Sequence, residues 1–173
     1  MREVKNLKKA LKWLNEYLEI TLCVILMSAM TLIIFIQVIM RYIFSNSLSW
    51  SEELARYLFI WLIYLGISYG CKIMKHIKID AALKLFPRGV RSFIMIVGDL
   101  IFLGFAIYVM VTGFQLTMLQ IQLTKTSPAM RLPLQYVYSA PMIGFALAAF
   151  RELQTLAYRI QAIKKGEISE EEN

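Results

Sequence analysis

A run of 21 residues, from Ile20 to Met40, contains no charged side chain. At about 1.5 Å of rise per helical residue the run spans roughly 31 Å, which is the thickness of the hydrocarbon core of a bilayer. The basic residues before it would also suit a secretory signal peptide, but the apolar core of such a peptide has only about 7 to 15 residues and leads into a cleavage site of the A-x-A type. The run therefore predicts an uncleaved transmembrane helix, in a chain that is 58% hydrophobic overall.

The rest of the chain alternates apolar segments with polar turns, which predicts a single all-α membrane domain over residues 1–173. Residues 1–19 place apolar side chains at alternating three- and four-residue spacing with lysines between them, as in an amphipathic helix. Four transmembrane helices are predicted, at 20–40, 54–74, 92–116 and 134–156, with short interfacial helices between them. The acidic segment 160–173 is predicted to be a disordered tail.

Lysine and arginine are distributed unevenly along the chain when Arg56, Lys72 and Arg151, which lie near the ends of predicted spans, are counted with the adjoining segments. Along the chain the segments hold five, two, six, two and four of them, which together are the 19 basic residues of the sequence. Because cytoplasmic segments are enriched in Lys and Arg, both termini are predicted to face the cytoplasm of a bacterial inner membrane. The net charge of +7 then reflects topology and contact with anionic lipids, and no motif for nucleic-acid binding accompanies it.

The turn between the first two predicted spans concentrates polar residues at the outer face of the membrane. Ser49 and Glu52 have the spacing of a capping box, which predicts a helix that starts near Trp50. Glu52 and Glu53 fall in its first turn, and Arg56 is spaced to pair with either of them. An exposed pair of this kind contributes only about 0.3 to 0.5 kcal/mol. Two interpretations stay open: local capping beside an aromatic belt, or a contact with another subunit.

Asp99 is the one acidic residue well inside an apolar segment. An Asp at a helix centre costs roughly 2.5 to 3.5 kcal/mol, which the surrounding aliphatic and aromatic side chains, at about 0.3 to 0.6 kcal/mol each, can offset. Such an acid indicates either an ion or proton site or a structural ion pair. Its position about two turns past Arg91 favours pairing with a basic residue near the inner face.

Small residues recur at four-residue spacing in two of the predicted spans. Gly66 and Gly70 form a G-x-x-x-G pair, and Ala140, Gly144 and Ala148 form a second stripe. Small residues let the backbones of membrane helices approach closely. Both stripes therefore predict helix-packing surfaces.

Residues with catalytic or metal-binding chemistry are scarce. His76 is the only histidine, and the two cysteines, Cys23 and Cys71, both lie in apolar segments, so no bis-His haem, zinc site or disulfide framework is predicted. The sequence contains no H-E-x-x-H, G-x-S-x-G or P-loop motif. We therefore predict that the chain is not an enzyme and binds no cofactor or metal.

The polar turns carry motifs in a recognisable order. They read Arg41-Tyr42-Ile43-Phe44, then Ser47 to Glu53 with Arg56, then His76-Ile77-Lys78-Ile79-Asp80, and finally Ser127-Pro128-Ala129 followed by Pro133 and Tyr138. From about residue 41 to 144 the chain thereby resembles the small membrane subunit of tripartite ATP-independent periplasmic (TRAP) transporters.

The resemblance implies a four-helix scaffold that does not itself bind substrate. Its implied partners are a large, many-helix membrane subunit with the substrate and sodium sites, and a periplasmic binding protein that delivers an organic acid such as a dicarboxylate or a sialic acid. The residues implied to form a structural motif or a contact with subunits or lipid are Arg41, Trp50, Glu52, Glu53, Arg56, His76, Asp80, Ser127, Pro128 and Pro133.

Two other classes of membrane protein have some of the same features. A small homodimeric, proton-coupled transporter of the multidrug type also has four helices, but that class carries its essential acid in the first helix, and 20–40 contains none. A membrane anchor for a redox enzyme is disfavoured because haem ligands are missing.

Overall fold

The computed structural model describes residues 2–46, 48–73 and 88–165, and these residues form an all-helical structure. Its helices are α1 (Arg2–Tyr42), α2 (Ser49–Lys72), α4 (Arg88–Gln122) and α5 (Gln135–Lys165). The prediction of an all-α fold is confirmed. His76, Asp80 and the interfacial helix expected after them lie outside the described residues.

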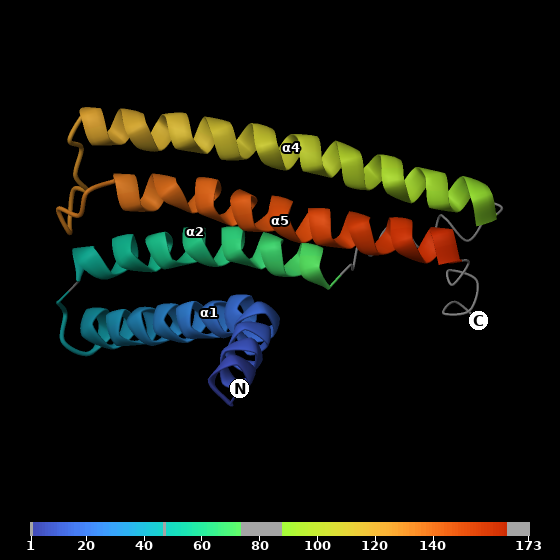
Figure 1. The fold of residues 1–173 in the computed structure, drawn as a ribbon. Coiled ribbons are helices and arrows are strands. Elements are labelled where there is room, and N and C mark those ends of the chain that lie inside the picture. Colours follow the sequence, from blue (N-terminus) through green and yellow to red (C-terminus); the bar gives the residue numbers. More distant parts are fainter. Residues whose placement is uncertain (1, 47, 74–87, 166–173) are drawn as a thin grey trace.

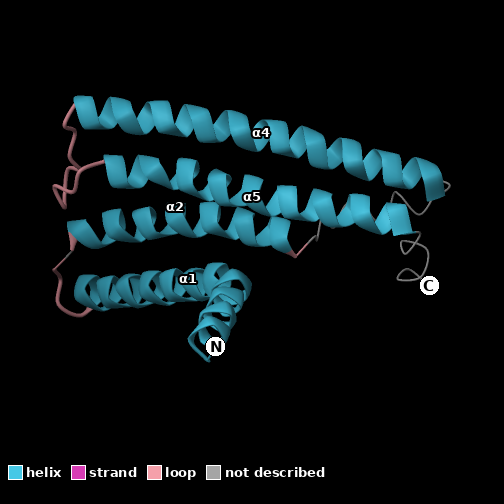
Figure 2. Ribbon diagram, in the orientation of Figure 1, coloured by secondary structure: helices cyan, strands magenta, loops and turns pink. Residues whose placement is uncertain are grey.

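The helices form a single layer in the order α1, α2, α5, α4 (Figure 1). Successive helices run in opposite directions, so residues 43–46 and the loop 123–134 lie together at one end of the layer, as Figure 2 shows. We call this end the link end and the opposite one the terminal end. The two inner helices, α2 and α5, are covered on both sides, whereas α1 and α4 form the edges.

Three helical segments are long and apolar enough to cross a membrane: Tyr17–Tyr42, Ser49–Lys72 and Phe93–Gln122. The described residues therefore form a multi-pass membrane protein, as predicted. The segment 134–156 does not reach the same apolarity, because Arg151 and Glu152 interrupt it. A crossing by α5, and hence the number of four crossings, stays a prediction.

Several helix boundaries differ from the prediction. α1 continues from the N-terminal segment into the apolar run without a break, although Figure 1 shows that its first part bends out of the layer. α4 extends to Gln122, and α5 continues to Lys165. The prediction that the disordered tail begins at residue 160 is wrong, because residues 160–165 contain no helix breaker and Gly166 is the first one.

The stripe of small residues in α5 packs against its neighbours. Ala140 and Ala148 are fully buried, and a Cβ atom added to Gly144 would lie 2.5 Å from Tyr64 Cβ of α2. Gly113 of α4 permits a second close approach, because its added Cβ would lie 3.0 Å from the backbone nitrogen of Met142. These contacts set the spacing of α2, α5 and α4.

The G-x-x-x-G pair in α2 behaves differently. A Cβ atom added to Gly66 or Gly70 would meet nothing within 4 Å. No helix in the described part of the chain packs closely on these glycines, so their predicted packing partner does not lie among the described residues.

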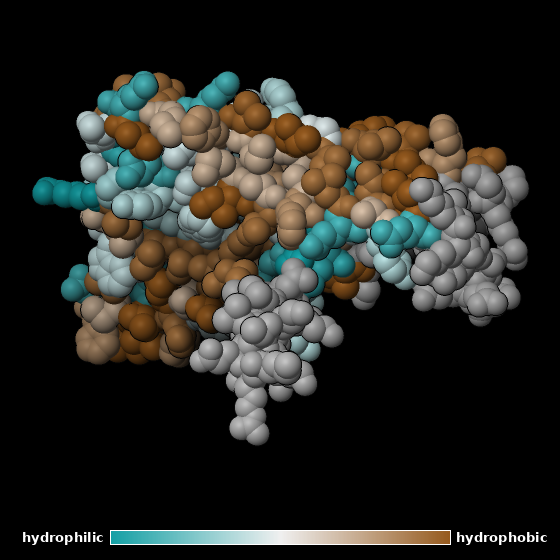
Figure 3. All heavy atoms as spheres, viewed as in Figure 1, coloured by the Kyte–Doolittle hydropathy of each residue, from teal (hydrophilic) through white to brown (hydrophobic). Residues whose placement is uncertain are grey.

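The exposed surface of the layer is strongly apolar (Figure 3). Along α1, Leu32 and Phe35 are each 61% exposed, and along α4, Ile101 and Tyr108 are 69% and 67% exposed. Large apolar faces of this kind are stable only in contact with lipid or with other membrane helices.

Candidate functional site: polar clusters at the two ends of the layer

Glu53 connects α2 to the loop between α4 and α5 at the link end. Its carboxylate oxygen Oε2 accepts hydrogen bonds from the backbone N–H groups of Ala129 (2.9 Å) and Met130 (3.0 Å). The other oxygen, Oε1, accepts one from the Tyr57 hydroxyl group. Because hydrogen bonds to a charged acceptor are stronger than neutral ones, Glu53 fastens the loop to α2.

The loop has its own tight geometry around Ser127. The Ser127 N–H donates to the Leu132 carbonyl oxygen (2.8 Å), and the Leu132 N–H donates to Ser127 Oγ (3.2 Å). Arg131 lies in the left-handed region, with φ of 54°, so the chain reverses there. The loop is bracketed by Pro128 and Pro133, which cannot continue a helix hydrogen-bond ladder. The structure thus brings the Ser127, Pro128 and Pro133 motif onto Glu53, a link that the spacing of these motifs could not predict.

The predicted capping box is wrong. The N-cap residue of α2 is Leu48, and no side chain caps the helix there. Ser49 is already the first helical residue, and the Ser51 hydroxyl group instead donates to the Leu48 carbonyl oxygen (2.7 Å). Glu52 is used for a different purpose, because its Oε1 accepts a hydrogen bond from Gln37 Nε2 of α1 (2.7 Å).

The remaining predicted residues of this end are exposed. Trp50 is 42% exposed, and the side chains of Arg41 and Arg56 are exposed as well. Among the described ion pairs, none joins Arg56 to Glu52 or Glu53, so the predicted pairing along the helix does not occur. Arg56 therefore forms no ion pair with the acidic residues in the first turn of its own helix.

A buried ionic cluster ties three helices together toward the terminal end. Glu19 of α1 is 1% exposed, and its Oε1 accepts hydrogen bonds from Arg151 Nε of α5 (2.7 Å) and from the Ser68 hydroxyl group of α2 (3.1 Å). Its second oxygen lies 3.7 Å from Lys72 Nζ. Arg151 also donates from Nη1 to Gln154 Oε1 (3.0 Å). We call these five residues the Glu19 cluster.

A second cluster joins α4 to α5. Asp99 is buried, and its Oδ2 lies 3.0 Å from Arg159 Nε. This contact is an ion pair, but its geometry is not that of a hydrogen bond, and Asp99 Oδ2 accepts no hydrogen bond from any other group. The expectation that Asp99 pairs with a basic residue agrees with this contact, although the partner comes from α5. Glu152, which is fully buried, lies near the Asp99 carboxyl group and the Arg159 guanidinium group, both of which act on its charge. Asp99, Glu152 and Arg159 form the Asp99 cluster.

Sequence reasoning missed Glu19, Ser68, Arg151 and Glu152. The sequence does contain a feature that could have indicated three of them. Glu19 borders the uncharged run, and Arg151 and Glu152 are adjacent charged residues at the end of an apolar segment. Charges in such positions need partners, because a buried unpaired charge is costly. Which helices supply the partners depends on the order of the layer, which the sequence does not specify.

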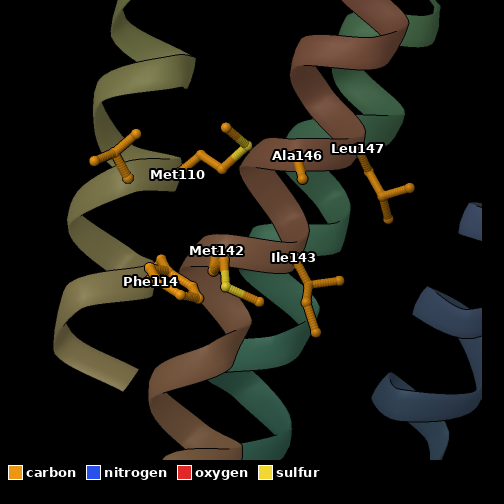
Figure 4. A pocket seen from close by; sticks show the side chains of 7 residues that line it. Met110, Phe114, Met142, Ile143, Ala146 and Leu147 are labelled. Carbon is orange, nitrogen blue, oxygen red and sulfur yellow. The ribbon is translucent and has the colours of Figure 1, made fainter. Parts of the chain in front are cut away.

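An apolar groove lies between α4 and α5, closer to the link end than the Asp99 cluster. Its volume is about 610 Å³. Met110, Val111 and Phe114 line it from α4, and Met142, Ile143, Ala146 and Leu147 line it from α5 (Figure 4). The lining offers no polar group that could orient a carboxylate substrate. Within the described ranges, no group of three or more His, Cys, Asp or Glu side chains could hold a metal ion.

The described helices, three of which contain segments long and apolar enough to cross a membrane, define a multi-pass helical membrane protein. Residues 30–162 match the family described as tripartite ATP-independent periplasmic transporters, DctQ component, and the chain belongs to this family.

Relatives of the chain include proteins of similar and of much greater length. A putative TRAP transporter small permease protein of Haemophilus influenzae is 28% identical over 156 residues, covering 90% of this chain and 95% of the relative. The C4-dicarboxylate TRAP transporter small permease protein DctQ of Vibrio cholerae is 30% identical, covering 84% of this chain and 72% of the relative. The isethionate TRAP transporter permease protein DctMQ of Oleidesulfovibrio alaskensis is 32% identical, but this chain spans only 25% of its length.

These relatives are transporter permease proteins, which confirms the prediction that the chain is not an enzyme. They also favour the TRAP interpretation over a multidrug-type transporter.

Proposed function

We propose that this chain is the scaffold subunit of a sodium-coupled TRAP transporter in a bacterial inner membrane. It crosses the membrane four times with both termini in the cytoplasm, and it binds a large, many-helix subunit that carries the substrate. A periplasmic binding protein delivers the organic acid, a dicarboxylate or a sialic-acid-like compound. The observation that carries the proposal is the family match over residues 30–162.

Association with a larger membrane subunit is supported by sequence and by surface. In the DctMQ relative, the matched region makes up only 25% of a longer permease protein, so the same segment exists there joined to additional chain. Here α1 and α4 expose large apolar side chains along both edges of a one-layer structure. A layer of this shape has two broad faces available to a neighbouring helical protein. Gly66 and Gly70 lie open on α2, where a helix of another subunit could pack.

Contact with the periplasmic protein is proposed for the link end. The side chains of Arg41, Arg56, Lys125 and Arg131 are exposed there. The acids there are fewer: Glu53 is buried against the loop, and Glu52 is exposed but hydrogen-bonded to Gln37. The link end therefore presents a surplus of positive charge, which would attract an acidic surface of the delivering protein.

The proposal is tested by uptake in the native cells. The chain is deleted, and uptake of labelled C4-dicarboxylates and of sialic acid is measured with and without sodium. We expect sodium-dependent uptake of one organic acid to disappear and to return when the chain is supplied from a plasmid. Unchanged uptake of all organic acids in the deletion strain would contradict the proposal, as would proton-coupled efflux from cells that express this chain alone.

A further inference from the structure

Glu152 is an unusual buried acid. It is 0% exposed, and neither of its carboxylate oxygens accepts a hydrogen bond in the described part of the structure. The desolvation of an ionised carboxylate costs several kcal/mol unless donors or cations replace the lost water. Glu53, with three donors on its carboxylate, shows how this chain satisfies an acid that stays ionised.

The basic side chains near Glu152 form their contacts with other acidic residues. Arg151, its neighbour in sequence, donates to Glu19 and Gln154, and the Lys72 ammonium group also lies against Glu19. Arg159 contacts Asp99. Two charged groups act directly on Glu152: the Asp99 carboxyl group, which has the same charge, and the Arg159 guanidinium group, which already pairs with Asp99.

Two carboxyl groups in contact cannot both be ionised in a buried site, but one proton shared between them turns repulsion into a hydrogen bond. We propose that Glu152 and Asp99 form a proton-binding site between α4 and α5, in which protonated Glu152 donates a hydrogen bond to the Asp99 carboxylate. Arg159 balances the single remaining negative charge. With the proton bound, Asp99, Glu152 and Arg159 have no net charge, and the buried oxygens of Glu152 need no second cation.

The surroundings of the site oppose loss of this proton. On α2, the Cys71 thiol group lies close enough to Glu152 for the two groups to interact electrostatically. A buried thiol group stays neutral, so it adds no positive charge that could stabilise ionised Glu152. Glu19 of α1 brings a second negative charge close to Cys71, the same thiol group that Glu152 acts on. On α5, Arg159 is shared with Asp99, and Arg151 is turned to Glu19. Ionisation of Glu152 would therefore place an uncompensated negative charge in the α4–α5 contact. The contact is stable while the proton is bound and weakens as the pH rises far enough to remove it.

The test is difference infrared spectroscopy of the full-length chain, purified in lipid nanodiscs at neutral pH. We expect a band from the C=O stretch of a protonated carboxyl group, which shifts in D₂O and is lost in Glu152→Gln. The matched control is Glu52→Gln, which changes an exposed acid at the other end of the layer and should leave the band in place. The spectra are recorded with sodium and with a large organic cation in its place. A wild-type protein without the band, a band that persists in Glu152→Gln, or a band that sodium abolishes would each overturn the proposal.

A second readout addresses the fold. Glutamine supplies the donor that protonated Glu152 supplies, without its charge, so the thermal stability of Glu152→Gln should equal that of the wild type at neutral pH. At alkaline pH the wild type should lose stability that the variant keeps. A variant that is destabilised equally at all pH values would show that Glu152 acts as an ionised partner, contrary to the proposal.

Discussion

Replacing Gly144 by alanine is expected to force α2 and α5 apart. The added methyl group would lie 2.5 Å from Tyr64 Cβ, 2.8 Å from the Tyr64 carbonyl oxygen and 2.9 Å from its carbonyl carbon. Two of these atoms belong to the backbone of α2, so a rotamer change of Tyr64 cannot relieve the contact. Since carbon atoms normally pack at about 3.5 to 4 Å, the helices must separate by about 1 Å at this level. Inserting a methyl group into a packed core in this way costs about 1 to 3 kcal/mol.

Gly66→Ala is the matched control for this experiment. The same methyl group placed on Gly66 meets nothing within 4 Å. Both changes alter intrinsic helix propensity in the same direction, by up to about 1 kcal/mol in a helix interior, and that contribution cancels when the two variants are compared. The expected difference between them is therefore the steric cost at Gly144 alone.

The assay is thermal unfolding of both variants in the same detergent, followed by tryptophan fluorescence. A difference of 1 kcal/mol corresponds to about 2 to 4 °C in the unfolding temperature for a chain of this size. Gly144→Ala should unfold below Gly66→Ala by at least that amount. Equal unfolding temperatures would refute the inference that Gly144 sets the spacing between α2 and α5.

Three further predictions concern the polar clusters and the topology. Glu53→Gln should free the Ala129 and Met130 amides from their charged acceptor, so that hydrogen exchange of the loop 123–134 accelerates, whereas Glu52→Gln should leave that exchange unchanged; an unaltered loop in Glu53→Gln would contradict the proposed fastening. Glu19→Ala and Arg151→Ala should each destabilise the chain by about 3 to 5 kcal/mol, because each removes the closest oppositely charged group from a buried charge, and the double variant should cost less than the two single changes together in a double-mutant cycle; simple additivity would show that the ion pair is not coupled. In a variant without the native cysteines, Ser45→Cys should react with a membrane-impermeant maleimide added to intact spheroplasts and Gln161→Cys only after permeabilisation, and the reverse pattern would mean that the proposed orientation is inverted.

Local patterns in the sequence predict the helices of this chain well. The uncharged run from Ile20 to Met40 belongs to a helix, and the prolines of the segment 123–134 lie in a link without helix. The small residues Ala140, Gly144 and Ala148 pack as their spacing indicates. These features depend on periodicity and on helix breakers, which are properties of neighbouring residues.

The contacts between distant segments could not be predicted in the same way. Arg151 lies 132 residues from Glu19, and Ala129 lies 76 residues from Glu53, so no spacing rule connects them. The order α1, α2, α5, α4 decides that Asp99 meets Arg159. Likewise the capping box failed because α2 begins one residue earlier than its pattern implies, which moves Ser49 into the helix.

The central claim, that this chain is the scaffold of a larger transporter, is tested most directly by what it binds in its native membrane. The chain, tagged at its C-terminus, is purified in mild detergent from its own cells, and the co-purifying proteins are identified and quantified by mass spectrometry. We predict recovery of one large, many-helix membrane protein in about equal molar amount, with its yield reduced when Gly66 and Gly70 are both changed to leucine. Recovery of the chain alone, as a homodimer without a larger partner, would contradict the scaffold function.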